Sequence, residues 1–117
     1  MTLRVDDRGV LRLVWAPRLR ITGELAKDSV RWAEDLSDGV PRPMLVDITG
    51  EAVTTREARH VFADTTSVAR LALLGRSAVN RVIANFTLSV DPPAIPVRYF
   101  TDEAAALEWL LDDDARR

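Results

Sequence analysis

Apolar residues follow two patterns in the middle of the chain, and the two patterns alternate. Met44 to Ile48 and Ala69 to Leu74 are nearly unbroken apolar runs of strand length, which is typical of strands covered on both faces. Each run is followed by a segment with apolar residues every three or four positions, which predicts a helix. The clearest of these stripes consists of Val79, Val82, Ile83, Phe86 and Val90. We therefore expect buried strands connected by amphipathic helices.

The start of the chain predicts a β-hairpin and a first helix. Leu3–Asp6 and Val10–Trp15 flank the turn-forming trio Asp7-Arg8-Gly9, as in a hairpin with a short loop. Thr22 is the expected N-cap of a helix from about Glu24 to Leu36. The face of this helix that should turn inward carries Leu25, Trp32, Ala33 and Leu36.

The strand Met44–Ile48 should lead through a loop into a second helix, from about Thr55 to Thr66. Thr54 and Glu57 have the spacing of a capping box at the helix start. Asp47 is the one charge inside the apolar run. A charge at a buried strand end must find a partner, so we expect it to pair with a backbone N–H or an arginine.

The C-terminal third predicts two more helices and one strand. A helix should run from Ser77 to about Leu88, and Pro96–Phe100 should form the last strand. Thr101 or Asp102 then caps a final helix. Its apolar face carries Ala104, Leu107, Leu110 and Leu111. Asp112–Asp114 place negative charge at the helix C-terminus, which opposes the macrodipole and favours fraying.

The predicted order is ββαβαβαβα, which indicates an α/β fold in one domain of residues 1–117. The expected sheet is mixed and has about five strands: an N-terminal hairpin followed by βαβαβα units with right-handed crossovers. Arg4, Arg12 and Arg98 interrupt the outer strands with a period of two. Part of the sheet on the hairpin side should therefore be open to water or to a partner.

Composition excludes several classes of function. The net charge is −2, which supplies no basic field for nucleic acid. The chain has no cysteine, and so no disulfide framework or thiolate metal site. No apolar run approaches the ~18 residues of a membrane span. We expect a soluble, cytoplasmic protein without metal or cofactor.

Two segments resemble a known family. Ala69–Gly75 reads ARLALLG and Pro96–Leu110 reads PVRYFTDEAAALEWL. With the predicted element order, they resemble SpoIIAA-like proteins of the STAS group (sulfate transporter and anti-sigma-factor antagonist), also described as STAS/SEC14-like. The resemblance covers most of the chain. It implies a small mixed sheet wound with helices, and a binding or regulatory role without catalysis.

The junction after the predicted strand Met44–Ile48 departs from that family. Asp47-Ile48-Thr49-Gly50 resembles the Asp-Leu-Ser-Gly of the anti-sigma antagonists. Their following Asp-Ser pair, whose serine is phosphorylated to switch partners, is replaced here by Thr-Arg. The resemblance therefore extends to the fold and not to the partner-switching mechanism.

Polar residues follow three of the predicted strands and suggest an anion site. In open α/β sheets, ligands bind beyond the carboxyl ends of the strands, where helix N-termini offer free N–H groups. The candidate residues are Thr49, Thr54, Thr55, Arg56, Arg76, Ser77 and Arg81. The alternative is that the hydroxyls only cap helices and the arginines form a solvated rim. Thr54 and Thr55 are also candidate phosphoacceptors, beside Arg56.

No arrangement of residues indicates catalysis. His60 is the only histidine, and without a second ligand of its kind we interpret it as a surface or boundary residue. The chain shows no Ser-His-Asp order, phosphate loop or metal motif. Trp15, Trp32 and Trp109 are expected in the core. Exposure of Trp15 or Trp32 would instead indicate an interface.

The leading hypothesis is a non-catalytic, STAS-like module that binds a protein partner, with a homodimer as the expected assembly. The partner would bind on the hairpin side or at the helix starts. The alternative is a SEC14-like carrier of an apolar or anionic small molecule, which requires a pocket of ~300 Å³ or more.

Overall fold

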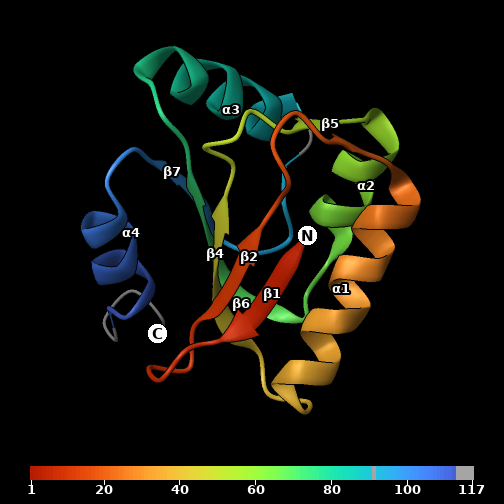
Figure 1. Cartoon of the computed structure of the whole chain (residues 1–117), viewed down its shortest axis with the longest axis vertical. Helices are drawn as coiled ribbons and strands as arrows, with labels where there is room; N and C mark the ends of the chain where they lie inside the picture. The colour runs from red at the N-terminus through yellow and green to blue at the C-terminus, as the bar shows by residue number, and fades with distance from the viewer. Residues whose placement is uncertain (91, 113–117) are drawn as a thin grey trace.

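The computed structural model describes residues 1–90 and 92–112, and these form a five-stranded mixed sheet with four helices around it (Figure 1). The elements in chain order are β1 (Thr2–Val5), β2 (Leu11–Val14), β3 (Arg20–Ile21), α1 (Gly23–Ser37), β4 (Arg42–Asp47), β5 (Val53–Thr54), α2 (Arg56–Asp64), β6 (Val68–Leu74), α3 (Ala78–Val90), β7 (Val97–Phe100) and α4 (Glu103–Leu110). The strand order is β1-β2-β4-β6-β7, while β3 and β5 form a separate two-stranded sheet. β1 and β2 are antiparallel, and the other neighbouring pairs are parallel.

The sheet confirms the predicted α/β fold class. The N-terminal hairpin turns where Asp6 N donates to Val10 O at 2.9 Å, and Gly9 adopts a φ of 81° there. β4 contains the apolar run from the middle of the sequence and lies at the centre of the sheet. Met44 pairs with Leu11 on one side and with Leu71 on the other.

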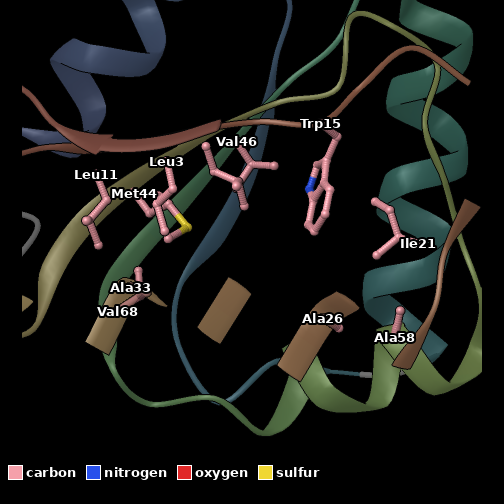
Figure 2. Close-up of a cluster of buried hydrophobic side chains, with 11 residues drawn as sticks. Leu3, Leu11, Trp15, Ile21, Ala26, Ala33, Met44, Val46, Ala58 and Val68 are labelled. Carbon is pink, nitrogen blue, oxygen red and sulfur yellow. The ribbon is translucent and has the colours of Figure 1, made fainter. Parts of the chain in front are cut away.

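Successive side chains of a strand point to opposite faces, so the sheet contributes to two cores. The larger core lies under α1 and α2 (Figure 2) and includes Leu3, Leu11, Leu13, Trp15, Met44, Val46, Ala26, Ala33 and Ala58. The smaller core lies under α4 and includes Val10, Leu45, Ala72, Leu74, Phe100, Ala106 and Leu110. The two cores are the reference points for the sites described below.

α1 begins as predicted but turns a different face to the sheet. Thr22 is its N-cap, and the Thr22 hydroxyl accepts a hydrogen bond from Leu25 N at 3.2 Å. The buried residues of α1 are all small: Ala26, Ser29, Ala33 and Ser37. Trp32 is 42% exposed, so the prediction that it belongs to the core is wrong. Small side chains allow the helix backbone to approach the sheet, and Trp32 is left on the outer side.

α2 begins one residue later than the predicted capping box requires. The N-cap is Thr55, whose hydroxyl accepts from Ala58 N at 3.2 Å. Thr54 belongs to β5 and pairs with Ile21 of β3, so the capping box of Thr54 and Glu57 is wrong. The short β3–β5 sheet is not predicted, because two-residue strands show no alternation of apolar and polar residues.

The last two helices differ from prediction in their packing. α4 starts at the predicted cap, where Asp102 Oδ1 accepts from Ala104 N at 3.3 Å, but Ala104 itself is exposed. α3 has the predicted period, yet none of its residues is buried. Of the predicted fraying segment Asp112–Asp114, only Asp112 lies within the described residues.

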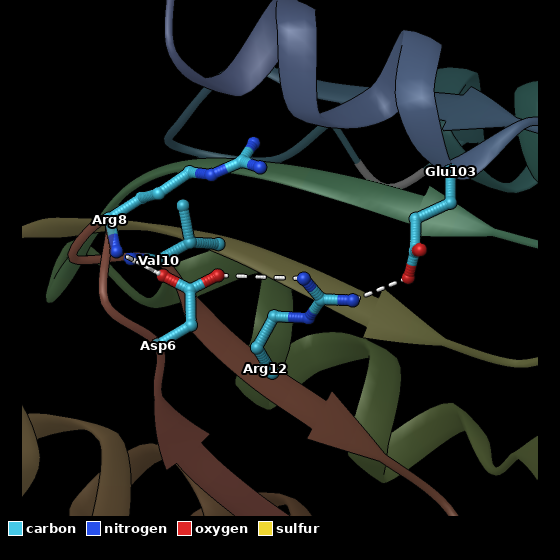
Figure 3. Close-up of polar contacts among 5 residues, drawn as sticks. All are labelled: Asp6, Arg8, Val10, Arg12 and Glu103. Atoms are coloured by element: carbon cyan, nitrogen blue, oxygen red, sulfur yellow. Dashed lines mark hydrogen bonds and ion pairs between the residues drawn. The ribbon is translucent and has the colours of Figure 1, made fainter.

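A chain of charges ties the hairpin to α4 (Figure 3). Asp6 Oδ1 accepts from the backbone N–H groups of Arg8 and Val10 at 2.9 and 3.0 Å. Arg12 contacts Asp6 Oδ2 at 3.4 Å and forms an ion pair with Glu103, in the first turn of α4. Partial burial acts to raise the pKa of Asp6, but the two backbone hydrogen bonds and Arg12 outweigh it and hold that pKa below 3.8.

The hairpin half of the α4 side is open, as predicted. Arg4 and Val14 on β1 and β2 are exposed there, and Arg12 is half-buried. α4 packs on β4, β6 and β7 instead, which leaves this half of the sheet face uncovered by α4 (Figure 1).

Candidate functional site

An apolar cavity of about 550 Å³ lies between the sheet and the helices α1, α2 and α3. Its walls include Met44 and Val46 of β4, Leu71 and Leu73 of β6, and Val97 of β7. Ligand pockets in proteins fall between about 300 and 1,000 Å³ and have mainly apolar walls with a few polar groups. The cavity meets that description.

The small residues of α1 explain part of this space. Ser29 and Ala33 line the cavity from the α1 side, and the Ser29 hydroxyl donates to Ala26 O at 2.8 Å, within the helix. Side chains of this size bring the helix near the sheet but do not reach far from its axis. They therefore leave volume above Met44 and Val46 that a leucine or phenylalanine at these positions would fill.

The position of α3 explains the rest. α3 lies across the edge of the sheet at which β6 and β7 end, rather than over the face of those strands (Figure 1). Leu71 and Leu73, in the middle of β6, are consequently only half-buried. The inner side of α3 contributes Asn80, Ala84, Thr87 and Leu88 to the cavity wall. α3 thus roofs the cavity without filling it.

The cavity reaches the surface between β5 and α3. Val53 of β5 and Ile83 of α3 both line it and are 63% and 59% exposed. Polar groups also lie among the lining residues: Thr54, Arg59 and Glu51. Arg59 Nη1 donates to Thr54 O at 3.1 Å, which fixes the guanidinium beside the chain that leads into α2.

Two aromatic rings form part of the wall deep in the cavity. Trp15 and Phe62 both line it, and their ring centroids are 6.5 Å apart with the planes tilted by 59°. Trp15 is buried and projects from the end of β2 toward the helices (Figure 2). The prediction that Trp15 belongs to the core is confirmed, and its indole gives the cavity an internal fluorophore.

The three strand ends considered as an anion site do lie along one edge of the sheet. Ile48 N donates to Leu74 O, and Gly75 N donates to Phe100 O, each at 2.9 Å. Thr49 and Gly75 are therefore at the same end of neighbouring strands. Both Thr49 N and its hydroxyl donate to Asp47 Oδ1, at 2.9 and 2.6 Å, which confirms the expected structural pairing of Asp47.

The starts of α2 and α3 are held by strands of different sheets. Thr55, the cap of α2, donates from both its N–H and its hydroxyl to Ile21 O, at 3.0 and 2.9 Å. At the start of α3, the Ser77 hydroxyl accepts from Asn80 N at 3.2 Å, and Tyr99 OH of β7 donates to Ser77 O at 3.1 Å. Ile21 belongs to β3, which pairs with β5. Tyr99 belongs to β7, the outer strand of the five-stranded sheet at the end opposite β1.

The seven candidate residues consequently fall into separate groups. Arg81 lies with Ser77 at the α3 start, its guanidinium 5.9 Å from the centroid of the Tyr99 ring. Arg56 and Arg76 are exposed, and Thr54 is the candidate that lines the cavity. An anion-binding role for these residues, and phosphorylation of Thr54 or Thr55, stay predictions. Phosphorylation of Thr55 would break the hydrogen bond that its hydroxyl donates to Ile21 O.

Gly75 sets the geometry where β6 passes into α3. A Cβ at this position would overlap the phenol of Tyr99. The Tyr99 ring can lie against the chain and reach Ser77 O only because position 75 has no side chain. The start of α3 is thus fixed by β7.

The remaining chemistry of the described residues is sparse. His60 is exposed on α2, as the sequence predicts. Within residues 1–90 and 92–112 there is no group of three or more His, Asp or Glu side chains that could hold a metal ion. The same ranges contain no helix of the length and apolar character that a membrane crossing requires.

Sequence reasoning missed the cavity walls almost entirely. The candidates were chosen for polar groups at strand ends, whereas the walls are the ordinary apolar residues of strands and helices. One signal was present: Ala26, Ser29 and Ala33 recur at helical spacing in α1. A helix with small residues on its buried face leaves space, but the volume depends on where the other helices lie.

Comparison with solved structures supports the fold. A protein of the DUF3478 family from Shewanella loihica PV-4, described as uncharacterized and as having a SpoIIAA-like fold, matches with a TM-score of 0.55 at 16% identity. The match covers 93% of this chain and 90% of that one. The fold is therefore SpoIIAA-like, as the resemblance implies.

A second solved structure, a protein of unknown function from Arthrobacter sp. FB24, is 38% identical over 93% of this chain and 97% of that one, with a TM-score of 0.40. The comparison with proteins of curated function found no match. A family model described as "Domain of unknown function (DUF7793)" matches residues 3–112, and the chain accordingly belongs to the DUF7793 family.

Proposed function

We propose that this protein is a non-catalytic binding protein whose ligand is an apolar small molecule held in the cavity under α1, α2 and α3. The observation that carries the proposal is the cavity itself, with its volume of about 550 Å³ and its mainly apolar walls. An empty apolar space of this size is costly to maintain, because its walls lose the contacts that a packed core provides. A ligand that fills the space restores those contacts.

The polar groups of the wall favour binding over catalysis. Among the described residues that line the cavity, the ionisable side chains are Glu51 and Arg59. A carboxylate such as Glu51 serves as a nucleophile or general base beside a second catalytic group, and the described residues of the cavity lining include no second Asp or Glu and no His. We infer that these side chains and the hydroxyl of Thr54 orient one end of an otherwise apolar ligand near the mouth.

Binding can be tested with N-phenylnaphthylamine, an uncharged apolar dye. We expect saturable binding of one dye per chain, with energy transfer from tryptophan, because Trp15 lines the cavity. Ala84→Phe places a ring in the cavity from α3 and should weaken binding at least tenfold. Ala78→Phe is the matched control, since Ala78 is exposed on the same helix and should leave binding unchanged.

Two results would contradict the proposal. One is a wild-type protein that does not bind the dye at all. The other is equal binding by the two alanine variants, which would place the dye elsewhere on the protein. Circular dichroism spectra of both variants should match that of the wild type, so that loss of binding is not loss of folding.

A protein-binding role, as implied by the STAS resemblance, is the second candidate. The observation that favours it is α3, whose apolar stripe is exposed. Contiguous apolar patches of a few hundred Å² on a protein surface usually mark an interaction site. Among the described residues of α3, the exposed apolar stripe and the cavity lining share only Ile83, and the two roles do not exclude each other.

A further inference from the structure

α3 lines the cavity with a mixed face and carries its apolar stripe on another face. The inner face lines the cavity, while the outer stripe consists of Val79, Val82, Ile83, Phe86 and Val90. Val82 and Phe86 are each 68% exposed. A surface helix of a protein normally has one apolar stripe and an opposite polar face. A helix whose apolar stripe faces outward is therefore expected to be covered by another molecule.

The charges of α3 argue against a lipid surface as that cover. Arg81 is the only charged residue between Ala78 and Val90. Helices that lie in a membrane interface usually carry several Lys or Arg residues on the polar face, which attract anionic lipids. The net charge of the chain, −2, adds no attraction of that kind.

The outer stripe is, by contrast, complementary to itself. It contains no charged side chain, so two copies can face each other across a two-fold axis without bringing like charges together. Its five large side chains, each about two-thirds exposed, amount to roughly 500 Å² per copy. Two copies would then bury roughly 1,000 Å², which is the lower bound for a specific interface.

We propose that the outer stripe of α3 is a self-association surface, on which α3 of a second copy packs across a two-fold axis. The inference rests on the second candidate function, protein binding, and names its partner. It also links the two candidate functions, because Ile83 belongs to the stripe and to the cavity wall. A second copy seated on α3 narrows the mouth between Val53 and Ile83 and slows exchange of the ligand.

Sedimentation velocity over a range of concentrations tests the interface. We expect the wild type to change from monomer to dimer as its concentration rises. Val82→Glu and Phe86→Glu each bring a charge to the stripe and should raise the dimer dissociation constant by about 30-fold or more. Val40→Glu is the matched control, because Val40 is also an exposed valine but lies outside α3, and it should dimerise like the wild type.

A monomeric wild type at every concentration would overturn the proposal, as would dimers that persist in both α3 variants. Trp32→Glu tests another exposed apolar side chain, on α1: loss of the dimer in that variant alone would move the interface to α1. Wild-type protein that pellets with vesicles of phosphatidylcholine and phosphatidylglycerol through Phe86, while remaining monomeric, would show a lipid surface in place of the second copy.

Dye exchange separates this inference from the ligand proposal. Release of N-phenylnaphthylamine should be slower from wild-type dimer than from the Val82→Glu monomer. If the wild type dimerises through α3 but binds no dye, the cavity proposal fails and the interface stands. If it binds dye but never dimerises, the interface fails and the cavity proposal stands.

Discussion

On one face of the sheet, α4 sits close against the strands; on the other, three helices enclose a space. Under α4, Ala106 and Leu110 are fully buried, and the rings of Phe100 and Trp109 lie 5.7 Å apart. On the other face, Leu71 and Leu73 of β6 are half-buried and line the cavity. The two faces are built on alternate residues of the same backbone.

The difference separates a closely packed face of the sheet from a face that encloses space. The α4 side has the packing expected of a protein interior, where removal of even one methylene is felt. On the other side, α1 has small residues on its buried face and α3 lies at the edge of the sheet, so that a cavity is left between them. We expect the α4 side to be the more sensitive of the two to changes in side-chain volume.

The largest predicted effect compares two leucines. Leu110→Ala removes a fully buried side chain from the α4 side and should lower the free energy of unfolding by about 3–5 kcal/mol. Leu73→Ala enlarges an existing cavity and should lower it by only about 1–2 kcal/mol. Urea denaturation of both variants measures the difference. Equal losses would mean that the two faces are packed alike.

A buried cation is the next point at which the α4 side can be tested. Arg70, 3% exposed on β6, donates to Trp109 O at 2.6 Å and lies 4.5 Å from the centroid of the Trp109 ring. Arg70→Met removes this charged donor and leaves Trp109 O with the longer contact from Asp112 N at 3.4 Å, which should cost about 2–3 kcal/mol. Arg76→Met, at an exposed site, should cost less than about 0.5 kcal/mol in the same urea titration.

Substitutions by larger side chains should change the free energy of unfolding with opposite signs on the two faces of the sheet. Ala106→Leu overpacks the α4 side and should lower the free energy of unfolding by about 1–3 kcal/mol. Ala84→Leu points into the cavity and should raise it by up to about 1 kcal/mol, as cavity-filling substitutions do. Thermal unfolding of the two variants and the wild type measures both changes. A destabilising Ala84→Leu would show that the cavity cannot accept added volume.

The smallest predicted effect is the loss of stability in acid that follows from protonation of Asp6. The pKa of Asp6 lies below 3.8 in the folded protein, so its contacts with Arg12 and with two backbone N–H groups add stability that is fully present above about pH 4 and is lost as the pH falls through the folded pKa. The contribution should be below about 1 kcal/mol, because the Arg12 pair is partly exposed.

Asp6→Asn tests this pH dependence. Its stability should be below that of the wild type at pH 7, and the gap should shrink on acidification. Asp7→Asn, on the same turn, is the control and should show no such gap. Because Arg12 also pairs with Glu103 of α4, hydrogen exchange in acid should rise first on the α4 side. Earlier exchange in α1 would contradict this.

The fold was predictable where one local signal decided the outcome. Nearly unbroken apolar runs such as Met44 to Ile48 predict the central strands, because both faces of these strands are covered. Thr22 and Asp102 mark helix starts, because a side-chain oxygen there satisfies a free N–H. Thr54 and Thr55 were both eligible as caps, and only the pairing of Thr54 with Ile21 of β3 decides between them.

The site was not predictable, because it depends on how elements are placed rather than on which elements form. Periodicity predicts α3 but not which way its stripe faces, and the stripe faces solvent. For α1, the large Trp32 suggested the inward face, whereas small Ala26 and Ala33 occupy it. A cavity is a difference between the volume that helices enclose and the volume that side chains fill, and no single residue reports that difference.

The glycine after β6 has a consequence for how this protein can vary. Even alanine at position 75 would place a carbon where the Tyr99 phenol sits, so the smallest possible enlargement would disturb the hydrogen bond from Tyr99 OH to Ser77 O at the start of α3. A residue with no functional group is thereby among the least replaceable in the chain. In a library of random variants, we expect many substitutions to be tolerated along the apolar walls of the cavity and almost none at Gly75.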